Sequence, residues 1–196
     1  MSTRDRLLDG ALEVMRTRGL AHTTTKEIAR AAGYSEATLY KSFSDKVDLF
    51  LSVLTERLPR IGLVQDGLAG RVGTGPVEQT LRELSAQTLA FYVESFPIAA
   101  SVFADAELLV RHRAGVLSRG SGPEMLSRTV TGYLDAERAA GRIAATADTA
   151  AVTSALVGAC FHRAFLLAFA GESVTDTERE RFADKLVSTL WPALRP

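Results

Sequence analysis

Residues 23–46 read TTTKEIARAAGYSEATLYKSFSDK. Thr24 and Glu27 have capping-box spacing, in which each side chain accepts a hydrogen bond from the backbone amide of the other, so a helix begins here. Gly33 permits the tight turn that ends this helix, and Ser35 is a suitable N-cap for the next one. The stretch therefore predicts two short helices joined by a tight turn.

Two further helices flank this pair. Apolar residues recur at helical spacing from residue 3 to residue 18 and again from about 45 to 58. Ala29 is small enough to let the third helix cross closely, and Ile28 with Leu39 forms a hydrophobic wedge between the two short helices. We expect a helix-turn-helix domain over residues 1–50, with the helix at 45–58 connecting it to the remainder.

The remainder, residues 51–196, is expected to form a larger helical domain. Residues 59–76 are rich in glycine and predict a loop. A helix begins at Val77, Pro97 kinks or ends it, and a shorter helical stretch follows to about Val110. The later helices are expected at 123–141, with Pro123 at the first helical position, at 149–170 and at 175–191. The fold class is therefore all-α, with about nine helices.

Composition supports this class and also bears on the charge of the surface and on where in the cell the protein is found. The content is 46% hydrophobic but only 7% aromatic, as expected for packed helices. The net charge is zero, so any basic surface must be local. Cys160 is the single cysteine, and no signal sequence opens the chain, which predicts a cytoplasmic protein. The apolar stretch 150–170 is not expected to span a membrane, because Arg163 near its centre costs roughly 2.5–3.5 kcal/mol on insertion.

A helix-turn-helix binds DNA by placing its second helix in the major groove. Helix starts offer free amides to phosphates, and Tyr40 and Lys46 add donors there. Base edges are read by exposed side chains of the second helix, and Glu36 among them either accepts from a cytosine amino group or pairs with Lys41. The expected DNA-binding residues are Thr24, Thr25, Lys26, Ser35, Glu36, Ala37, Thr38, Tyr40, Lys41 and Lys46.

Residues 23–46 resemble the signature of the tetracycline-repressor (TetR) family, including Leu39, Tyr40, Phe43 and Lys46 at that family's anchor positions. The resemblance covers about the first 55 residues. It implies a homodimer joined through the last two helices, a small apolar effector bound among the middle helices, and a repressor that this effector releases from a palindromic operator. It also implies phosphate contacts by Thr25, Ser35, Tyr40 and Lys46. The chain departs from the common pattern at Tyr34, Ala37 and Ser42.

The second domain carries aromatic and polar residues that form either a core or a pocket. An effector pocket is expected to use Gln87, Phe91, Tyr92, Phe103, Tyr133, Phe161, His162 and Arg163. A hydrogen bond between helices or at the dimer interface explains the polar members equally well. No ligand spacing predicts a metal, no cofactor is expected, and no catalytic constellation predicts an enzyme. The alternative is a helical small-molecule-binding or catalytic domain with a purely structural helix-turn-helix.

Overall fold

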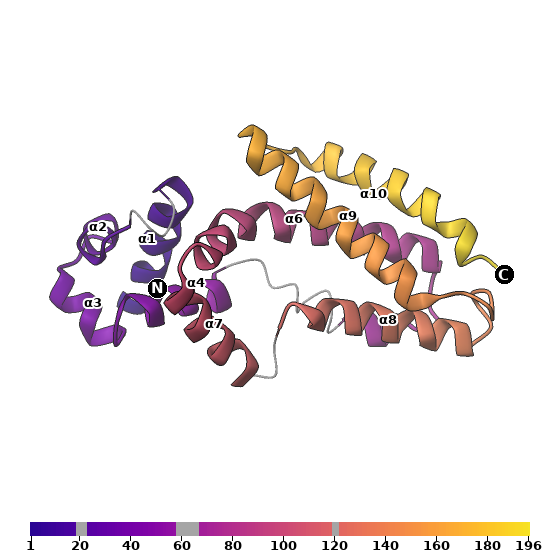
Figure 1. Cartoon of the computed structure of the whole chain (residues 1–196), viewed down its shortest axis with the longest axis horizontal. Coiled ribbons are helices and arrows are strands. Elements are labelled where there is room, and N and C mark those ends of the chain that lie inside the picture. Colours follow the sequence, from indigo (N-terminus) through magenta and orange to yellow (C-terminus); the bar gives the residue numbers. More distant parts are fainter. Residues whose placement is uncertain (19–22, 58–66, 119–121) are drawn as a thin grey trace. The chain divides into compact units, whose positions relative to one another are not determined.

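The computed structural model describes residues 1–18, 23–57, 67–118 and 122–196, and within these ranges it contains helices and no strands. This confirms the all-α class (Figure 1). The helices are α1 (Thr3–Arg18), α2 (Thr25–Ala31), α3 (Glu36–Ser42), α4 (Lys46–Glu56), α6 (Val77–Phe103), α7 (Ala106–Ser118), α8 (Glu124–Ala139), α9 (Thr149–Ala170) and α10 (Asp176–Leu190), with 3-10 turns at Ala69–Arg71 and Trp191–Ala193.

The chain forms two compact units. The first comprises Met1–Arg60 and Glu94–Gly122, and the second comprises Ile61–Val93 and Pro123–Pro196. Helix α6 contributes to both, because the division falls between Val93 and Glu94. Packing alone defines these units, so the functional boundary expected near residue 50 stays a prediction. Leu58, the last residue expected in the fourth helix, lies outside the described residues.

The core of the first unit joins α1, α2, α3 and α4 to the end of α6 and to α7. The expected wedge residues Ile28 and Leu39 are both fully buried in it. Its other buried members are Leu7, Leu8, Ala11, Met15, Ala29, Phe43, Leu49, Phe50, Val53, Ile98, Val102 and Leu108. The apolar faces read from the sequence thus converge on one interior, which holds the short helices α2 and α3 in place.

Helix α1 crosses the end of α2 at a glycine. A Cβ atom added at Gly10 would lie 2.9 Å from the backbone nitrogen of Ala32 and 3.0 Å from its Cβ. Only glycine allows this approach, since backbone atoms cannot move aside as the end of a side chain can. Gly10 therefore sets how closely α1 packs on the helix-turn-helix.

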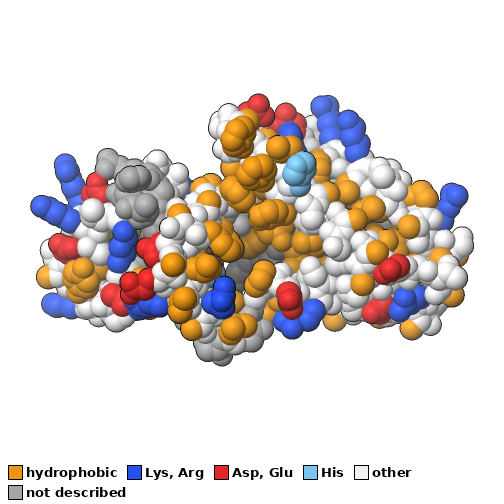
Figure 2. Space-filling model, in the orientation of Figure 1, with side chains coloured by type: hydrophobic (Ala, Val, Ile, Leu, Met, Phe, Trp, Pro, Cys, Tyr) orange, Lys and Arg blue, Asp and Glu red, His pale blue; other side chains and the backbone are white. Residues whose placement is uncertain are grey.

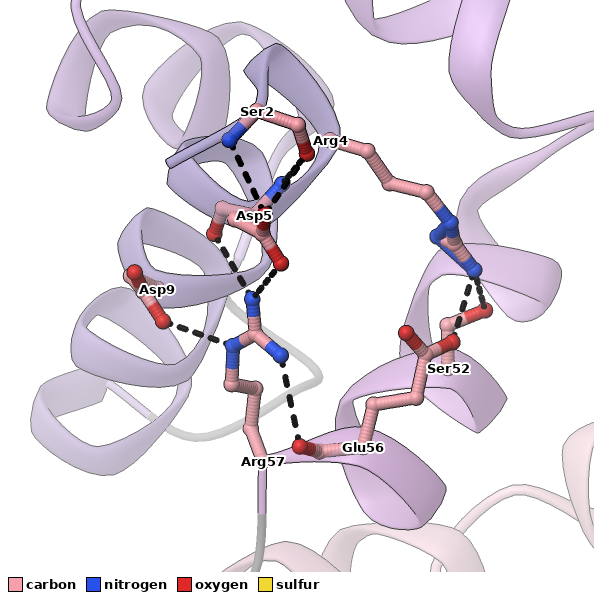
Figure 3. A network of polar contacts seen from close by, with 7 residues as sticks. All are labelled: Ser2, Arg4, Asp5, Asp9, Ser52, Glu56 and Arg57. Atoms are coloured by element: carbon pink, nitrogen blue, oxygen red, sulfur yellow. Dashed lines mark hydrogen bonds and ion pairs between the residues drawn. The ribbon is translucent and has the colours of Figure 1, made fainter.

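Polar contacts join α1 to α4 beside this core (Figure 3). The Arg57 guanidinium, directly after α4, donates to the carboxylates of Asp5 and Asp9 on α1 at 2.6 and 2.7 Å. In the opposite sense, Arg4 of α1 donates to the Glu56 carboxylate of α4 at 2.7 Å. Hydrogen bonds from Ser2 and from Arg57 hold the pKa of Asp5 well below its usual range. Ion pairs thus run in both directions, from a basic residue of α1 to α4 and from the basic residue after α4 to α1.

The second unit is built from the first part of α6 with α8, α9 and α10. Figure 1 shows α9 and α10 running side by side, joined by a short turn. The interior side of α9 is apolar, and its buried thiol, Cys160, has a pKa raised to about 12 by that burial. The core residues of this unit are Leu68, Val77, Leu81, Leu84, Leu126, Val130, Tyr133, Leu134, Ile143, Ala147, Val152, Leu156, Val157, Val187 and Leu194.

Three helix boundaries differ from the sequence expectation. Pro97 does not end its helix, because α6 continues through it to Phe103, and α7 extends to Ser118 rather than to Val110. Proline removes one intrahelical hydrogen bond, but Ile98 and Val102 just beyond it are buried and offset that loss. Pro123 is the N-cap of α8 rather than its first residue.

Candidate nucleic-acid interface

The turn between α2 and α3 has the geometry of a glycine-terminated helix end. The Tyr34 amide donates to the Ala29 carbonyl at 2.8 Å, and the Gly33 amide donates to the Arg30 carbonyl at 3.1 Å. This pair of bonds is a Schellman motif, which requires a left-handed residue, and Gly33 has φ 77°. The expected capping box of Thr24 and Glu27 is also present. Local hydrogen bonds thus fix the entry into α3.

Helix α3 presents one side to the core and the opposite side to solvent. Leu39 and Phe43, one turn apart, are buried, whereas Ala37 and Lys41, also one turn apart, are exposed. Tyr40 lies beside the exposed face, with 51% of its surface accessible. A seven-residue helix that is buried on one side and exposed on the other can serve as the recognition helix that enters a major groove.

A hydrogen-bonded chain connects α2 to α3 across this face. The Thr25 hydroxyl donates to a Glu36 carboxylate oxygen at 2.5 Å, and the Thr25 and Tyr40 hydroxyl oxygens lie 3.3 Å apart. The structure therefore brings together three of the residues expected at the DNA interface. In the protein alone, the Glu36 carboxylate accepts from Thr25. Contact of Glu36 with a cytosine amino group stays a prediction.

The remaining expected interface residues belong to the same compact unit. Ser35 caps α3 by accepting from the Thr38 amide at 3.3 Å, and the two hydroxyls lie 3.0 Å apart. Thr24 and Lys26 are exposed, and Lys46 is half-buried at the first position of α4. All ten residues are at least partly accessible, so a ligand as large as DNA can reach them.

The start of α4 differs from the expectation that its amides are free for a phosphate. The Asp45 carboxylate accepts from the Val47 and Asp48 amides at 2.8 Å each, and the Arg111 guanidinium of α7 donates to its other oxygen at 2.8 Å. These hydrogen bonds, that from Arg111 first, lower the pKa of Asp45 below its ordinary value. No local pattern in the sequence indicates a role for Arg111, because its partner is 66 positions away.

The residues expected to form an effector pocket are only partly brought together. In the second unit, the Tyr92 ring contacts those of Phe91 and Phe161, each at 5.4 Å between centroids. Tyr133 lies in the main core of that unit, and burial raises its pKa to about 12. Phe103 belongs to the other compact unit, where it is exposed.

The polar members of that expected set do not share one environment. In the single chain, Gln87 and His162 are exposed, whereas Arg163 is half-buried. Gln87 lines a surface groove of about 200 Å³ together with Arg71 and Glu83, which form an ion pair. The use of these residues by an effector stays a prediction.

Buried polar groups in the second unit were not anticipated from the sequence. Glu137 is fully buried, and it pairs with Arg142 at 3.0 Å and accepts from the Gly73 amide at 3.3 Å. The hydroxyls of Thr88 on α6 and Thr153 on α9 are buried and have no hydrogen-bond partner among the described residues. Helical periodicity marks such positions as interior but does not show whether their hydroxyls find a partner.

Two features of the described residues bear on metal binding and on membrane insertion. Within those ranges, no group of three or more His, Cys, Asp or Glu residues is placed to hold a metal ion. Helix α9 is long and apolar enough to cross a membrane by length and composition alone, and a third of its most apolar window is buried in the protein. One side of α9 packs against α8 and α10, as the core helix of a helical bundle does.

Residues 7–53 match the family described as bacterial regulatory proteins, tetR family. An uncharacterized HTH-type transcriptional regulator of Bacillus subtilis, YvkB, is 35% identical over 68 residues, which are 35% of this chain and 36% of that protein. The chain thus aligns with about a third of this curated relative. The family match covers the part of the chain that carries the helix-turn-helix.

Solved structures extend the similarity in fold to nearly the whole chain. A structure from Mesorhizobium loti, assigned to the TetR family of transcriptional regulators, has a TM-score of 0.77 and 21% identity, covering 99% of this chain and 97% of its own. The Bacillus subtilis regulator FadR, solved in complex with stearoyl-CoA, has a TM-score of 0.68 and 16% identity, with coverage of 94% and 96%. At these identities the comparison shows a shared fold.

Proposed function

Because this chain belongs to the TetR family of bacterial regulatory proteins, we propose that it is a DNA-binding transcriptional regulator that acts as a homodimer. Residues 1–50 serve as the DNA-binding domain, and residues 51–196 serve in dimerisation and effector binding. The protein acts in the cytoplasm, where its DNA target is found. Its mode of action is that of a repressor that leaves its operator when a small molecule binds.

The observation that carries this proposal is the exposed side of α3. Its core side is filled by Leu39 and Phe43, so the opposite side, with Ala37 and Lys41, remains accessible. Thr25, Ser35, Tyr40 and Lys46 surround that side with donors, as phosphate contacts require. In a dimer, two such helices enter successive major grooves about 34–36 Å apart on a palindromic operator.

Helix α9 supports the homodimer. Its outward side carries large apolar residues that are accessible in the single chain, with 48% of Phe161, 42% of Phe165 and 83% of Phe169 exposed. Figure 2 shows hydrophobic side chains gathered over α9. Small exposed residues precede them on the same helix at Ala151, Ser154, Ala155 and Gly158. An apolar surface of this kind is typical of a helix that pairs with its mate, and α9 with α10 is the proposed interface.

Effector binding is proposed for the second unit on the basis of its interior. Thr88 and Thr153 carry buried hydroxyls without partners among the described residues, and a bound molecule with polar atoms would satisfy them. The aromatic contact of Phe91, Tyr92 and Phe161 supplies apolar surface for the same purpose. That FadR binds stearoyl-CoA in a similar fold makes a small molecule with a long apolar part a suitable first probe.

Fluorescence anisotropy with two labelled duplexes tests the proposal. One duplex is selected by the protein from a random pool, and the other has a mixed sequence. Lys46→Ala is expected to weaken binding about tenfold and to lower the slope of log K against log salt by about 1, because one phosphate contact is lost. Tyr40→Phe is expected to weaken binding by a smaller factor.

The matched control is Arg128→Ala, which removes one exposed positive charge from the second unit. This control should leave the affinity for DNA within about twofold of the wild type. Absence of salt-sensitive binding by the wild type, or equal effects of Lys46→Ala and Arg128→Ala, would refute the proposed interface.

A further inference from the structure

The side chain of Glu36 occupies the donors that the proposed interface would offer to DNA. Thr25 has one hydroxyl proton, and at 2.5 Å from the Glu36 oxygen this proton is donated to the carboxylate. The Thr25 oxygen, 3.3 Å from the Tyr40 oxygen, is therefore left to accept from the Tyr40 hydroxyl. Both hydroxyl protons thus point along a chain from Tyr40 through Thr25 to Glu36.

This chain has consequences for an approaching phosphate. A phosphate is an acceptor only, so it can bind Thr25 or Tyr40 only by taking a proton that the chain already uses. The half-buried Glu36 carboxylate also carries the same sign of charge as the phosphate. The free protein thus holds an anion of its own among the donors proposed for DNA.

Resting on the proposed DNA-binding function, we propose that Glu36 is an affinity-limiting residue that competes with DNA phosphates for the hydroxyl of Thr25. A phosphate that binds this hydroxyl, in any DNA sequence, must first release it from Glu36. The residue therefore lowers affinity for all duplexes alike, in contrast to a base-reading residue, which would raise affinity for chosen sequences.

The expected effect follows from the two contributions that Glu36 makes. Removing one like charge near a phosphate and freeing one hydrogen bond are each worth a factor of roughly three at a partly solvated site. Glu36→Ala should therefore bind a mixed-sequence duplex about tenfold more tightly than the wild type. The gain should be similar for a duplex selected from a random pool.

A double-mutant cycle separates competition for the hydroxyls from simple repulsion. In a Thr25→Val background the donor is already absent, so Glu36→Ala should then gain threefold or less. The control Glu13→Ala removes an exposed negative charge from α1 of the same unit and should change affinity less than twofold. If Glu36→Ala lowers the melting temperature, Glu36→Met takes its place in the cycle, because methionine is a good helix former and offers Thr25 no strong acceptor.

The outcomes distinguish this inference from the function on which it rests. A wild-type protein without salt-sensitive binding to either duplex refutes the proposed function itself. A wild type that binds, together with a Glu36 variant that shows no gain, refutes only the role of Glu36. An equal gain with and without Thr25 also refutes it, as does a loss of affinity confined to the selected duplex, since that loss is the mark of a base-reading residue.

Discussion

Replacing Gly10 by alanine is expected to destabilise the first compact unit, although alanine is the better helix former. On helix propensity alone the change would stabilise α1 by about 1 kcal/mol. The added Cβ, however, would lie 2.9 Å from the Ala32 nitrogen and 3.2 Å from its Cα. These are backbone atoms, so α1 and the end of α2 must separate, and overpacking of this kind costs about 1–3 kcal/mol. We expect a net loss of up to about 2 kcal/mol.

Gly132→Ala is the matched control, because it makes the same change inside α8 where the new Cβ meets nothing within 4 Å. This control should gain up to about 1 kcal/mol. Urea unfolding followed by far-UV circular dichroism measures both variants. The single tryptophan, Trp191, packs against the core of the second unit, so its fluorescence reports that unit separately.

Hydrogen exchange locates the effect. The Ala32 amide donates to the Ile28 carbonyl at 3.0 Å, and its protection should fall in Gly10→Ala but not in Gly132→Ala. DNA affinity should fall as well, since the shift occurs where α1 supports the helix-turn-helix. If Gly10→Ala were as stable as the wild type, with unchanged protection at Ala32, the argument from close packing would be wrong.

Two further predictions concern the ion pair of Asp45 and the surface of α9. The lowered pKa of Asp45 means that its contribution to stability is present above the ordinary Asp value of 3.8 and is lost as the pH falls below it. Arg111→Gln should therefore flatten the dependence of stability on pH between 5 and 3, by a small amount because both side chains are 43% exposed. Equal flattening by Arg113→Gln would contradict the pairing. Gly158→Leu should leave the fold of the single chain intact, since a Cβ there meets nothing within 4 Å. It should shift the monomer–dimer equilibrium, measured by analytical ultracentrifugation, toward monomer. An unchanged dimer would exclude this part of α9 from the interface.

The order and extent of most helices follow from local features of the sequence. The capping boxes of Thr24 with Glu27 and of Thr175 with Glu178 are present as expected. Gly33 has the positive φ expected at the turn, and Asp148 caps α9. Each of these features depends on hydrogen bonds between residues fewer than six positions apart, so neighbouring side chains determine them without regard to the rest of the chain.

Other features depend on residues that only the tertiary structure brings together. Arg57 meets Asp5 across 52 positions, and Glu36 meets Thr25 across 11. The need for glycine at Gly10 comes from the backbone at Ala32, and Pro97 is accommodated because the residues beyond it are buried. Helical periodicity shows which side of a helix is apolar, but it does not show which residue of another helix lies opposite. The sequence by itself therefore determined the helix-turn-helix. The packing of α1 on α2 decided how closely it is held, and the packing of α3 against α2 decided that Glu36 meets Thr25.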